Sequence, residues 1–189
     1  MLSAEEARSR CWAEVDLGAL SANYREALSM LRPGVRLIPV LKANAYGLGA
    51  VQVAQTLTGL GADFFAVATL SEAEELLNIL PGCRVLVMGM VGPAQLERAI
   101  RVGARLTLFS LSGARALSDA ALRLGKLAVA HLKLDTGLHR LGFSPDQAGE
   151  LAHVAALAGL EVEGLYTHLA LRDAASDRAD GVDAEALAL

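Results

Sequence analysis

The chain has 189 residues, of which 53% are hydrophobic and 20% are charged, and its formal net charge is -4. This composition supports a buried core and excludes a disordered protein. The negative charge, together with arginines spread along the whole chain, argues against nucleic acid as a partner. No apolar run approaches the length of a membrane span, and the N-terminus lacks the apolar core of a signal peptide, so a cytoplasmic protein is expected. Cys11 and Cys83 fit neither a metal spacing nor a disulfide framework, so no metal site is expected.

The first elements expected in chain order are a short strand and a helix. The alternation of residues in Cys11–Asp16 favours a strand, which would end a leading segment of residues 1–16. Asp16 is a typical N-cap residue, and the apolar residues after it recur on one helical face as far as Leu31. Pro33 and Gly34 should end this helix.

The next stretch, Val35–Ala50, reads VRLIPVLKANAYGLGA and runs an apolar segment into a lysine and then into a glycine-rich turn. The residues before Lys42 suit a strand buried on both faces, and helical spacing resumes at Ala50. Pro39 is an objection, because a proline inside a strand removes a donor from the ladder and ordinarily indicates an edge or a bulge. Parallel α/β proteins place their chemistry at the carboxyl ends of strands, so Lys42 is the leading candidate for a reactive group.

Five further strands are predicted, and four of them are followed by an amphipathic helix. Ser71 and Glu74 have the spacing of a capping box, and so do Ser144 and Gln147. Pro93 should open another helix, since proline is best tolerated at the first helical position. The predicted strands cover residues 64–68, 85–88, 106–109, 127–134 and 162–167.

Strands that alternate with helices at short, even spacing indicate an α/β protein with parallel strands and right-handed crossovers. Two architectures remain, a doubly wound sheet and a (β/α)8 TIM-like barrel. A doubly wound sheet usually has a glycine fingerprint after its first strand, and the lysine-bearing turn lacks that spacing, so the barrel is favoured. A complete barrel takes about 250 residues, so about six strands within residues 1–171 predict an incomplete barrel. Residues 172–189 are polar and without periodicity, and a loop or frayed tail is expected there.

A lysine at the end of a strand is most often a surface charge with a packed stem. Only three of the 17 basic residues in this chain are lysines, which makes that explanation less fitting for Lys42. Unlike arginine, lysine can lose its proton when desolvated and attack a carbonyl to form a Schiff base. The segment LKANAYGLG resembles the pyridoxal-phosphate-binding lysine motif of alanine racemases. The resemblance implies that Lys42 is the attachment point and that Tyr46 contacts the cofactor phosphate.

Two cations, Lys133 and Arg140, are expected at the end of the strand over residues 127–134. Two cations in a partly buried site need an anion, either a carboxylate or phosphate ligand or a modification that reverses one charge. The alternative is that Asp135 pairs with one cation while water solvates the other. The segment HLKLDTGLHRLGF resembles the second racemase motif. In that family the matching arginine holds the substrate carboxylate, and the lysine at the position of Lys133 is commonly carbamylated and paired with it.

His168 follows the last predicted strand in the segment GLYTHLA. A lone histidine at such a place is most often a hydrogen-bonded structural residue. The segment is similar to the third racemase motif, whose histidine packs on the cofactor ring. The resemblance covers the chain from Trp12 to His168, and it departs from the family pattern at Leu48, where a histidine is usual.

The resemblance implies a pyridoxal-phosphate-dependent isomerase that interconverts L-alanine and D-alanine and so serves D-alanine biosynthesis for cell-wall precursors. A racemase for serine or another amino acid, and a cofactor-binding module without turnover, are the alternatives that stay open. Family members continue into a C-terminal β domain, which is absent from this sequence, and full-length members form homodimers. The opposing base in the family is a tyrosine from the partner's C-terminal domain, so the chain alone is expected to be inactive.

Overall fold

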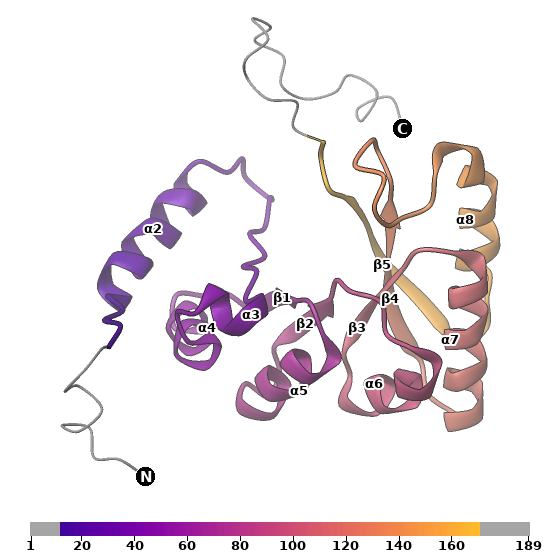
Figure 1. Ribbon diagram of the computed structural model, residues 1–189, viewed down its shortest axis with the longest axis horizontal. Helices are drawn as coiled ribbons and strands as arrows, with labels where there is room; N and C mark the ends of the chain where they lie inside the picture. The colour runs from indigo at the N-terminus through magenta and orange to yellow at the C-terminus, as the bar shows by residue number, and fades with distance from the viewer. Residues whose placement is uncertain (1–11, 171–189) are drawn as a thin grey trace, which may run out of the picture.

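Five parallel strands are hydrogen-bonded to one another in the order in which they occur in the sequence (Figure 1). The computed structural model describes residues 12–170. The strands are β1 (Phe64–Val67), β2 (Arg84–Val87), β3 (Arg105–Leu108), β4 (Ala128–Leu134) and β5 (Leu160–Thr167). The helices are α2 (Leu17–Ser29), α3 (Lys42–Tyr46), α4 (Ala50–Thr58), α5 (Leu70–Ile79), α6 (Leu96–Val102), α7 (Leu111–Leu124) and α8 (Ala148–Ala155), with short 3-10 helices at Pro93–Gln95 and Pro145–Gln147.

The sequential strand order distinguishes between the two predicted architectures. A doubly wound sheet reverses its strand order at a switch point, whereas a barrel adds each strand beside the previous one. Here each strand pairs with its successor, and α5 to α8 follow the same outer side of the curved sheet (Figure 1). The barrel-like winding predicted from the sequence is therefore confirmed. No helix within residues 12–170 combines the length and apolar character needed to cross a membrane.

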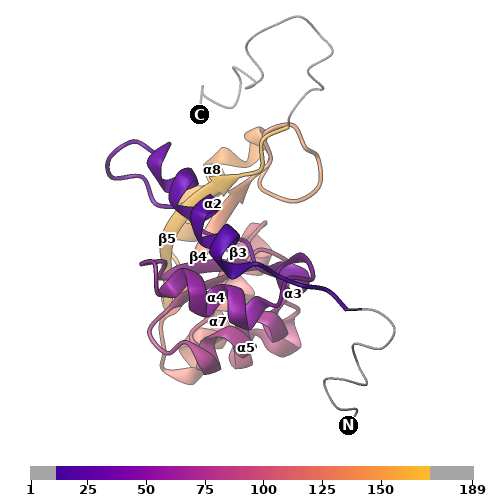
Figure 2. The same cartoon turned by 90° about the vertical axis from the view of Figure 1, so that its left-hand side faces the viewer.

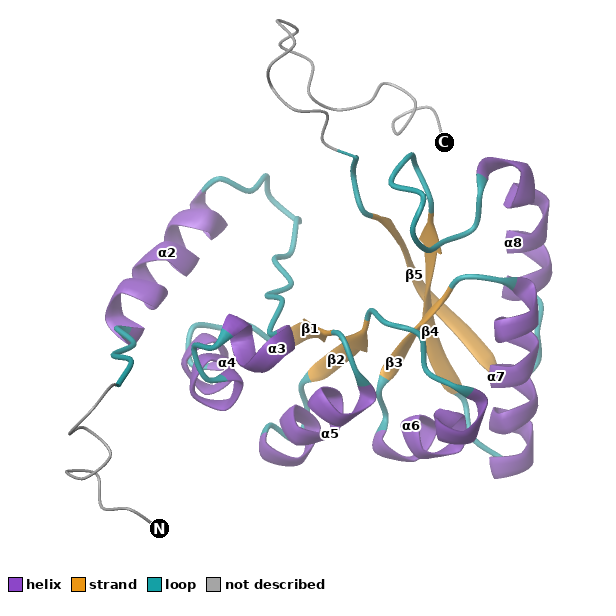
Figure 3. Cartoon of the chain, viewed as in Figure 1, coloured by secondary structure: helices purple, strands orange, loops and turns teal. Residues whose placement is uncertain are grey.

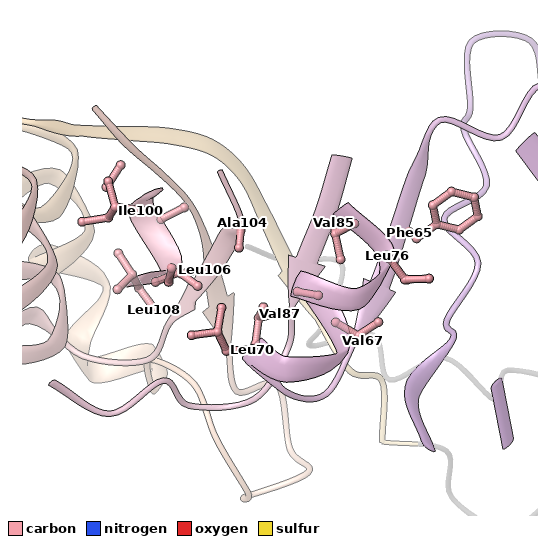
Figure 4. Close-up of a cluster of buried hydrophobic side chains, with 14 of the residues drawn as sticks. Phe65, Val67, Leu70, Leu76, Val85, Val87, Ile100, Ala104, Leu106 and Leu108 are labelled. Atoms are coloured by element: carbon pink, nitrogen blue, oxygen red, sulfur yellow. The ribbon is translucent and has the colours of Figure 1, made fainter. Parts of the chain in front are cut away.

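The main apolar core lies between the sheet and the helices on its outer face. Val85, Val87 and Leu106 point from β2 and β3 toward this layer, where Leu76 and Ile100 pack from α5 and α6 (Figure 4). Full burial of an apolar side chain of this size contributes about 1.5–3 kcal/mol. This layer therefore stabilises the strand order and leaves the opposite face of the sheet available for polar groups.

The predicted strand before the lysine is reduced to a single bridge, between Val40 and Ala66. The Ala66 N–H donates to the Pro39 carbonyl at 2.9 Å, and the Leu41 N–H donates to the Ala66 carbonyl at 2.8 Å. Because Pro39 has no N–H, the ladder cannot extend further back along the segment. The six predicted strands are thus five strands and one bridge, and Figure 3 shows the segment that leads to α3 as a loop.

The leading strand predicted over residues 11–16 is wrong where the structure describes it, because Trp12–Asp16 has no regular structure. Cys11 and the predicted tail over residues 172–189 lie outside the described residues. Asp16 does cap α2, since its Oδ1 accepts hydrogen bonds from the amides of Gly18 at 2.8 Å and Ala19 at 2.9 Å. Figure 2 turns the molecule so that α2 and α4, which contact each other, face the viewer.

One predicted capping box is confirmed, and the other is two residues out of place. The box at Ser144 forms as expected. The cap of α5 is Thr69 with Glu72, not Ser71 with Glu74. Thr69 has the extended backbone of an N-cap, with φ -126° and ψ 158°, because β1 ends only two residues before it. Glu72 is therefore the third residue of α5, the position whose side chain turns back toward the N-cap.

A bulge between β4 and β5 accommodates a buried histidine. The register of the two strands shifts between Ala130 and His131, which places Gly164 opposite His131. A Cβ atom at position 164 would lie only 2.6 Å from His131 Nδ1. The ring cannot easily move, because its Nε2 is hydrogen-bonded to Glu163 Oε2 at 3.1 Å. Glycine is therefore the residue that fits at position 164.

Replacing Gly164 with alanine should destabilise the fold by about 1–3 kcal/mol, because the new methyl group overlaps the His131 ring. Gly149→Ala is the matched control, since Gly149 lies in α8 and a Cβ there meets nothing within 4 Å. That control should stabilise the protein by about 0.5–1 kcal/mol. Urea unfolding of the two variants measures both effects, and a shift of the same sign for both would contradict the proposed overlap.

Candidate active site

A cavity of about 310 Å³ opens at the carboxyl ends of the strands. Its walls come from the segment after the Val40 bridge, the ends of β1 and β2, the end of β4 with the loop after it, and the end of β5. The five residues singled out from the sequence all line this one cavity: Lys42, Tyr46, Lys133, Arg140 and His168. Tertiary structure thus brings the three sequence motifs together.

Lys42 begins α3, which is a single turn wound in the left-handed sense. The φ angles of Ala43, Asn44 and Ala45 are 51°, 55° and 53°, and that of Tyr46 is 55°. Left-handed backbone costs a residue with a Cβ atom roughly 1–2 kcal/mol, and such strain collects at functional sites. From the sequence, only a loop is expected here. The turn instead keeps Lys42 Nζ 5.7 Å from the centroid of the Tyr46 ring.

Side chains tie the left-handed turn to the elements around it. Asn44 Oδ1 accepts a hydrogen bond from the Ala50 N–H at 2.7 Å and so caps the start of α4. Glu72 Oε1 accepts one from the Ala43 N–H, also at 2.7 Å. Glu72 was not among the residues singled out from the sequence, because its partner in the turn is 29 positions away. The turn is therefore held at Ala43 and at the start of α4.

Lys133 lines the cavity from the end of β4 and is only 5% exposed. Its Nζ donates a hydrogen bond to the Leu141 carbonyl. Burial lowers the pKa of Lys133, the negative charge of Asp135 opposes this, and the positive charge of Arg140 lowers the pKa further. A lysine in such surroundings gives up its proton more readily and is a better nucleophile than an exposed lysine.

The loop that carries Arg140 folds back onto the end of β4. The Phe143 N–H donates to the Lys133 carbonyl at 2.8 Å, and the Asp135 N–H donates to the Phe143 carbonyl at 2.9 Å. Gly142 permits this close return, with φ 135°, and a Cβ there would lie 2.6 Å from the Asp135 nitrogen. The backbone on both sides of Arg140 is thereby fixed to the sheet.

Asp135 does not neutralise either cation by direct pairing. Its Oδ1 accepts hydrogen bonds from the amides of Gly137 at 3.2 Å and His139 at 2.9 Å. These bonds, that of His139 foremost, lower the pKa of Asp135. Within residues 12–170, neither Lys133 nor Arg140 forms an ion pair with a carboxylate. The alternative in which Asp135 pairs with one of them is therefore not what the structure shows.

The charges that line the cavity are all of one sign. Lys42, Lys133 and Arg140 contribute to its wall, and its described lining contains no aspartate or glutamate. Cations that share a partly desolvated site repel one another and favour an anionic ligand. Phosphate and carboxylate groups are the anions that lysine and arginine bind with charge-assisted hydrogen bonds. The site is therefore suited to a ligand that carries more than one negative charge.

The cavity also has walls that the sequence analysis did not single out, formed by Val40, Ala68, Met88, Gly89, Leu141 and Tyr166. Tyr166 is two residues before His168, so the two-residue period of an extended segment could have indicated that both line the cavity. Its hydroxyl is 3.0 Å from Thr107 Oγ1, which in turn donates to the Val87 carbonyl at 2.8 Å. Burial raises the pKa of Tyr166, although the hydrogen bond with Thr107 acts against it, so the group remains a neutral phenol.

Residues 15–188 match the sequence profile of the alanine racemase N-terminal domain, a match that covers most of the chain. The chain belongs to this family. An alanine racemase from Desulforamulus reducens is 42% identical over 164 residues, which are 86% of this chain and 44% of that protein. The alanine racemase of Clostridium difficile 630 superposes with a TM-score of 0.81 at 33% identity, over 85% of this chain and 43% of the other.

A third alanine racemase, from Bartonella henselae, was solved with covalently bound pyridoxal phosphate. It superposes with a TM-score of 0.76 at 28% identity, over 82% of this chain and 46% of the other. The chain thus spans less than half the length of these relatives. The resemblance to alanine racemases stated from the three motifs is confirmed. Leu48, where this sequence departs from the motif, is 46% exposed and does not line the cavity.

Proposed function

We propose that this chain is the pyridoxal-phosphate-binding domain of an isomerase that interconverts L-alanine and D-alanine. The observation that supports this most is the convergence of Lys42, Lys133 and Arg140 on a cavity whose described lining has no carboxylate. Pyridoxal phosphate combines an aldehyde, an aromatic ring and a phosphate. The cavity offers an amine for the aldehyde, the ring of His168 for the aromatic ring, and the Tyr46 hydroxyl together with positive charge for the phosphate. The residues present therefore fit the cofactor.

Lys42 has two roles in this proposal. Its amine would hold the cofactor covalently, and when free it would take or return a proton at the α-carbon of the substrate. The cofactor supplies an electron-withdrawing ring that stabilises negative charge at that carbon. Tyr46 would hold the phosphate, and His168 would support the ring. These assignments carry the family's roles onto residues that line the same cavity.

Arg140 binds the substrate carboxylate in this proposal. A guanidinium group can form two parallel hydrogen bonds with a carboxylate, which fixes the orientation of the amino acid as well as its charge. Arg140 is available for this role, because it has no hydrogen-bond or ion-pair partner in the part of the chain that the structure describes. The neutral amine of Lys133 adds to carbon dioxide and releases a proton to give a carbamate, whose negative charge pairs with Arg140 and removes the repulsion between the two side chains.

The complete reaction needs a proton donor on each face of the planar α-carbon, and Lys42 serves only the face from which it approaches. We propose that the opposing donor comes from a partner subunit in a homodimer, as in the family. The substrate is an amino acid, and alanine is favoured over serine or other side chains by the family match. Comparison of turnover on a panel of enantiomers distinguishes among these substrates.

The covalent attachment can be tested by incubating the chain with pyridoxal phosphate, reducing it with borohydride and mapping the labelled peptide. The label is expected on Lys42, because this is the lysine at the cavity wall that matches the attachment position. Lys42→Ala should abolish the label, whereas Lys126→Ala should retain it. A label on Lys126, or no label on the unmodified chain, would show that the proposed function is wrong.

Arg140→Ala should weaken the binding of alanine to the cofactor-loaded chain about 10- to 100-fold, since a hydrogen bond to a charged group contributes about 1.5–3 kcal/mol. Binding can be followed through the change in cofactor absorbance. Arg115→Ala is the control, because Arg115 is an exposed residue of α7 remote from the cavity lining. Cofactor attachment at Lys42 should persist in both variants, and its loss in Arg140→Ala would instead indicate a structural role.

The carbamate on Lys133 should form in bicarbonate at a lower pH than on an ordinary lysine. Its folded-state pKa is lowered from 10.5, so more of the neutral amine that reacts with carbon dioxide is present at a given pH. Carbon-13 NMR with labelled bicarbonate detects the carbamate directly. The signal should vanish in Lys133→Met and persist in Lys126→Met, and its survival in the Lys133 variant would exclude this site.

A further inference from the structure

Glu72 forms more hydrogen bonds than a capping box requires. In such a box the acidic side chain accepts from the backbone N–H of the N-cap residue. Glu72 Oε2 performs this task, accepting from the amides of Thr69 and Ala68, each at 2.9 Å. Its other oxygen, Oε1, takes no part in the cap and accepts a hydrogen bond from the Ala43 N–H at 2.7 Å. One carboxylate therefore joins the start of α5 to the residue that directly follows Lys42.

The turn that follows Lys42 needs such an anchor. Its four residues with positive φ carry a Cβ atom and would not adopt this backbone in isolation. Hydrogen bonds from the Ala45 N–H to the Leu41 carbonyl, at 2.8 Å, and from the Gly47 N–H to the Ala43 carbonyl, at 3.0 Å, close the turn internally. The Ala43 N–H lies in the first part of the turn, and its partner is Glu72.

Lys42 is flanked by two tethered residues. On one side the Leu41 N–H donates to the Ala66 carbonyl of β1 at 2.8 Å. On the other side the Ala43 N–H donates to Glu72 at 2.7 Å. Because the sheet contact ends at the Val40 bridge, the second tether holds the backbone on the side of Lys42 where no strand ladder continues. The backbone of the lysine is thus fixed from both directions.

We propose that Glu72 is a positioning residue for Lys42, holding the Ala43 backbone so that the lysine side chain is directed into the cavity. This inference rests on the proposed function, because it takes Lys42 as the residue that binds the cofactor. Glu72 does not line the cavity and acts only through the turn.

A carboxylate is needed for the three contacts that Glu72 makes. It offers two acceptor oxygens, whereas glutamine offers one oxygen and an NH2 group that can only donate. Burial would raise the pKa of Glu72, but the hydrogen bonds from Ala43, Thr69 and Ala68 outweigh it and lower the pKa. A lowered folded-state pKa means that the contribution to stability is present above the unfolded-state value and is lost as the pH falls through the folded-state value. The tether therefore operates at neutral pH.

The test compares three variants of the 189-residue chain. Glu72→Gln removes an acceptor from the tether. Glu75→Gln makes the same change of charge on an exposed position of α5. Thr69→Ala removes the hydroxyl that accepts from the Glu72 N–H at 3.3 Å but leaves the carboxylate in place, so it weakens only the helix cap.

Two measurements are made on each variant: the hydrogen exchange of the Ala43 amide without cofactor, and the rate at which borohydride traps pyridoxal phosphate on Lys42. Glu72→Gln should speed the exchange of this amide about tenfold, as expected for the loss of one hydrogen bond. It should also slow the trapping several-fold. Glu75→Gln should change neither quantity, and Thr69→Ala should lower the unfolding temperature with little effect on trapping.

Each alternative outcome has a distinct meaning. Unchanged exchange of the Ala43 amide in Glu72→Gln overturns the tether, whether or not cofactor binds. Faster exchange with an unchanged trapping rate overturns the positioning role, and so does an equal slowing of trapping in Thr69→Ala. If the unmodified chain is not labelled at Lys42, the proposed function fails, while the exchange measurement still decides whether Glu72 holds the turn.

Discussion

Ala66 of β1 forms two backbone hydrogen bonds with the segment before Lys42, and the position of this lysine depends on them. Pro39 prevents the ladder from extending back beyond this bridge, and the turn at Ala43 takes the chain out of the sheet directly after it. The left-handed turn then replaces a regular strand end. A lysine at the end of an ordinary strand would be held by a ladder, whereas Lys42 is held by one bridge and by the carboxylate of Glu72.

The inner face of the sheet is divided along the strands by polarity. At the amino ends, Glu163 contacts Arg105 at 3.2 Å and His131 at 3.1 Å. Burial would raise the pKa of Glu163, but its hydrogen bonds with His131 and Arg105 outweigh this, so the group stays an anion. Phe64, at the start of β1, and Leu86 belong to a small apolar cluster on this face. The cations that line the cavity occupy the carboxyl ends.

The two ends of the sheet therefore differ in how their charges are balanced. The charges at the amino ends pair with one another, and ion pairs that remain partly exposed contribute little to stability. The cations at the carboxyl ends have no such partners among the described residues of the cavity wall. A ligand or a modification must therefore supply the missing negative charge. The backbone hydrogen bonds of Phe143 with Lys133 and Asp135 hold the loop against the end of β4 and keep Arg140 at this end of the sheet.

The sequence by itself determined the order and type of most elements. Local signals are sufficient for this, because a cap such as Asp16 or the box at Ser144 acts within a few residues of itself. Alternation of strands and helices also predicted parallel, barrel-like winding, and the three motifs identified the family. The strand predicted before Lys42 is only a single bridge in the structure. Residue propensities do not show how many ladder hydrogen bonds remain when one residue is a proline.

Only the tertiary structure decided how the site is held together. Nothing in the local preferences of Ala43 or Ala45 favours a left-handed turn, and the contact that holds it comes from Glu72, far along the chain. The need for glycine at position 164 also cannot be predicted from the neighbouring sequence, because it arises from His131 on the adjacent strand. These features depend on contacts between distant segments, and such contacts exist only once the sheet has assembled.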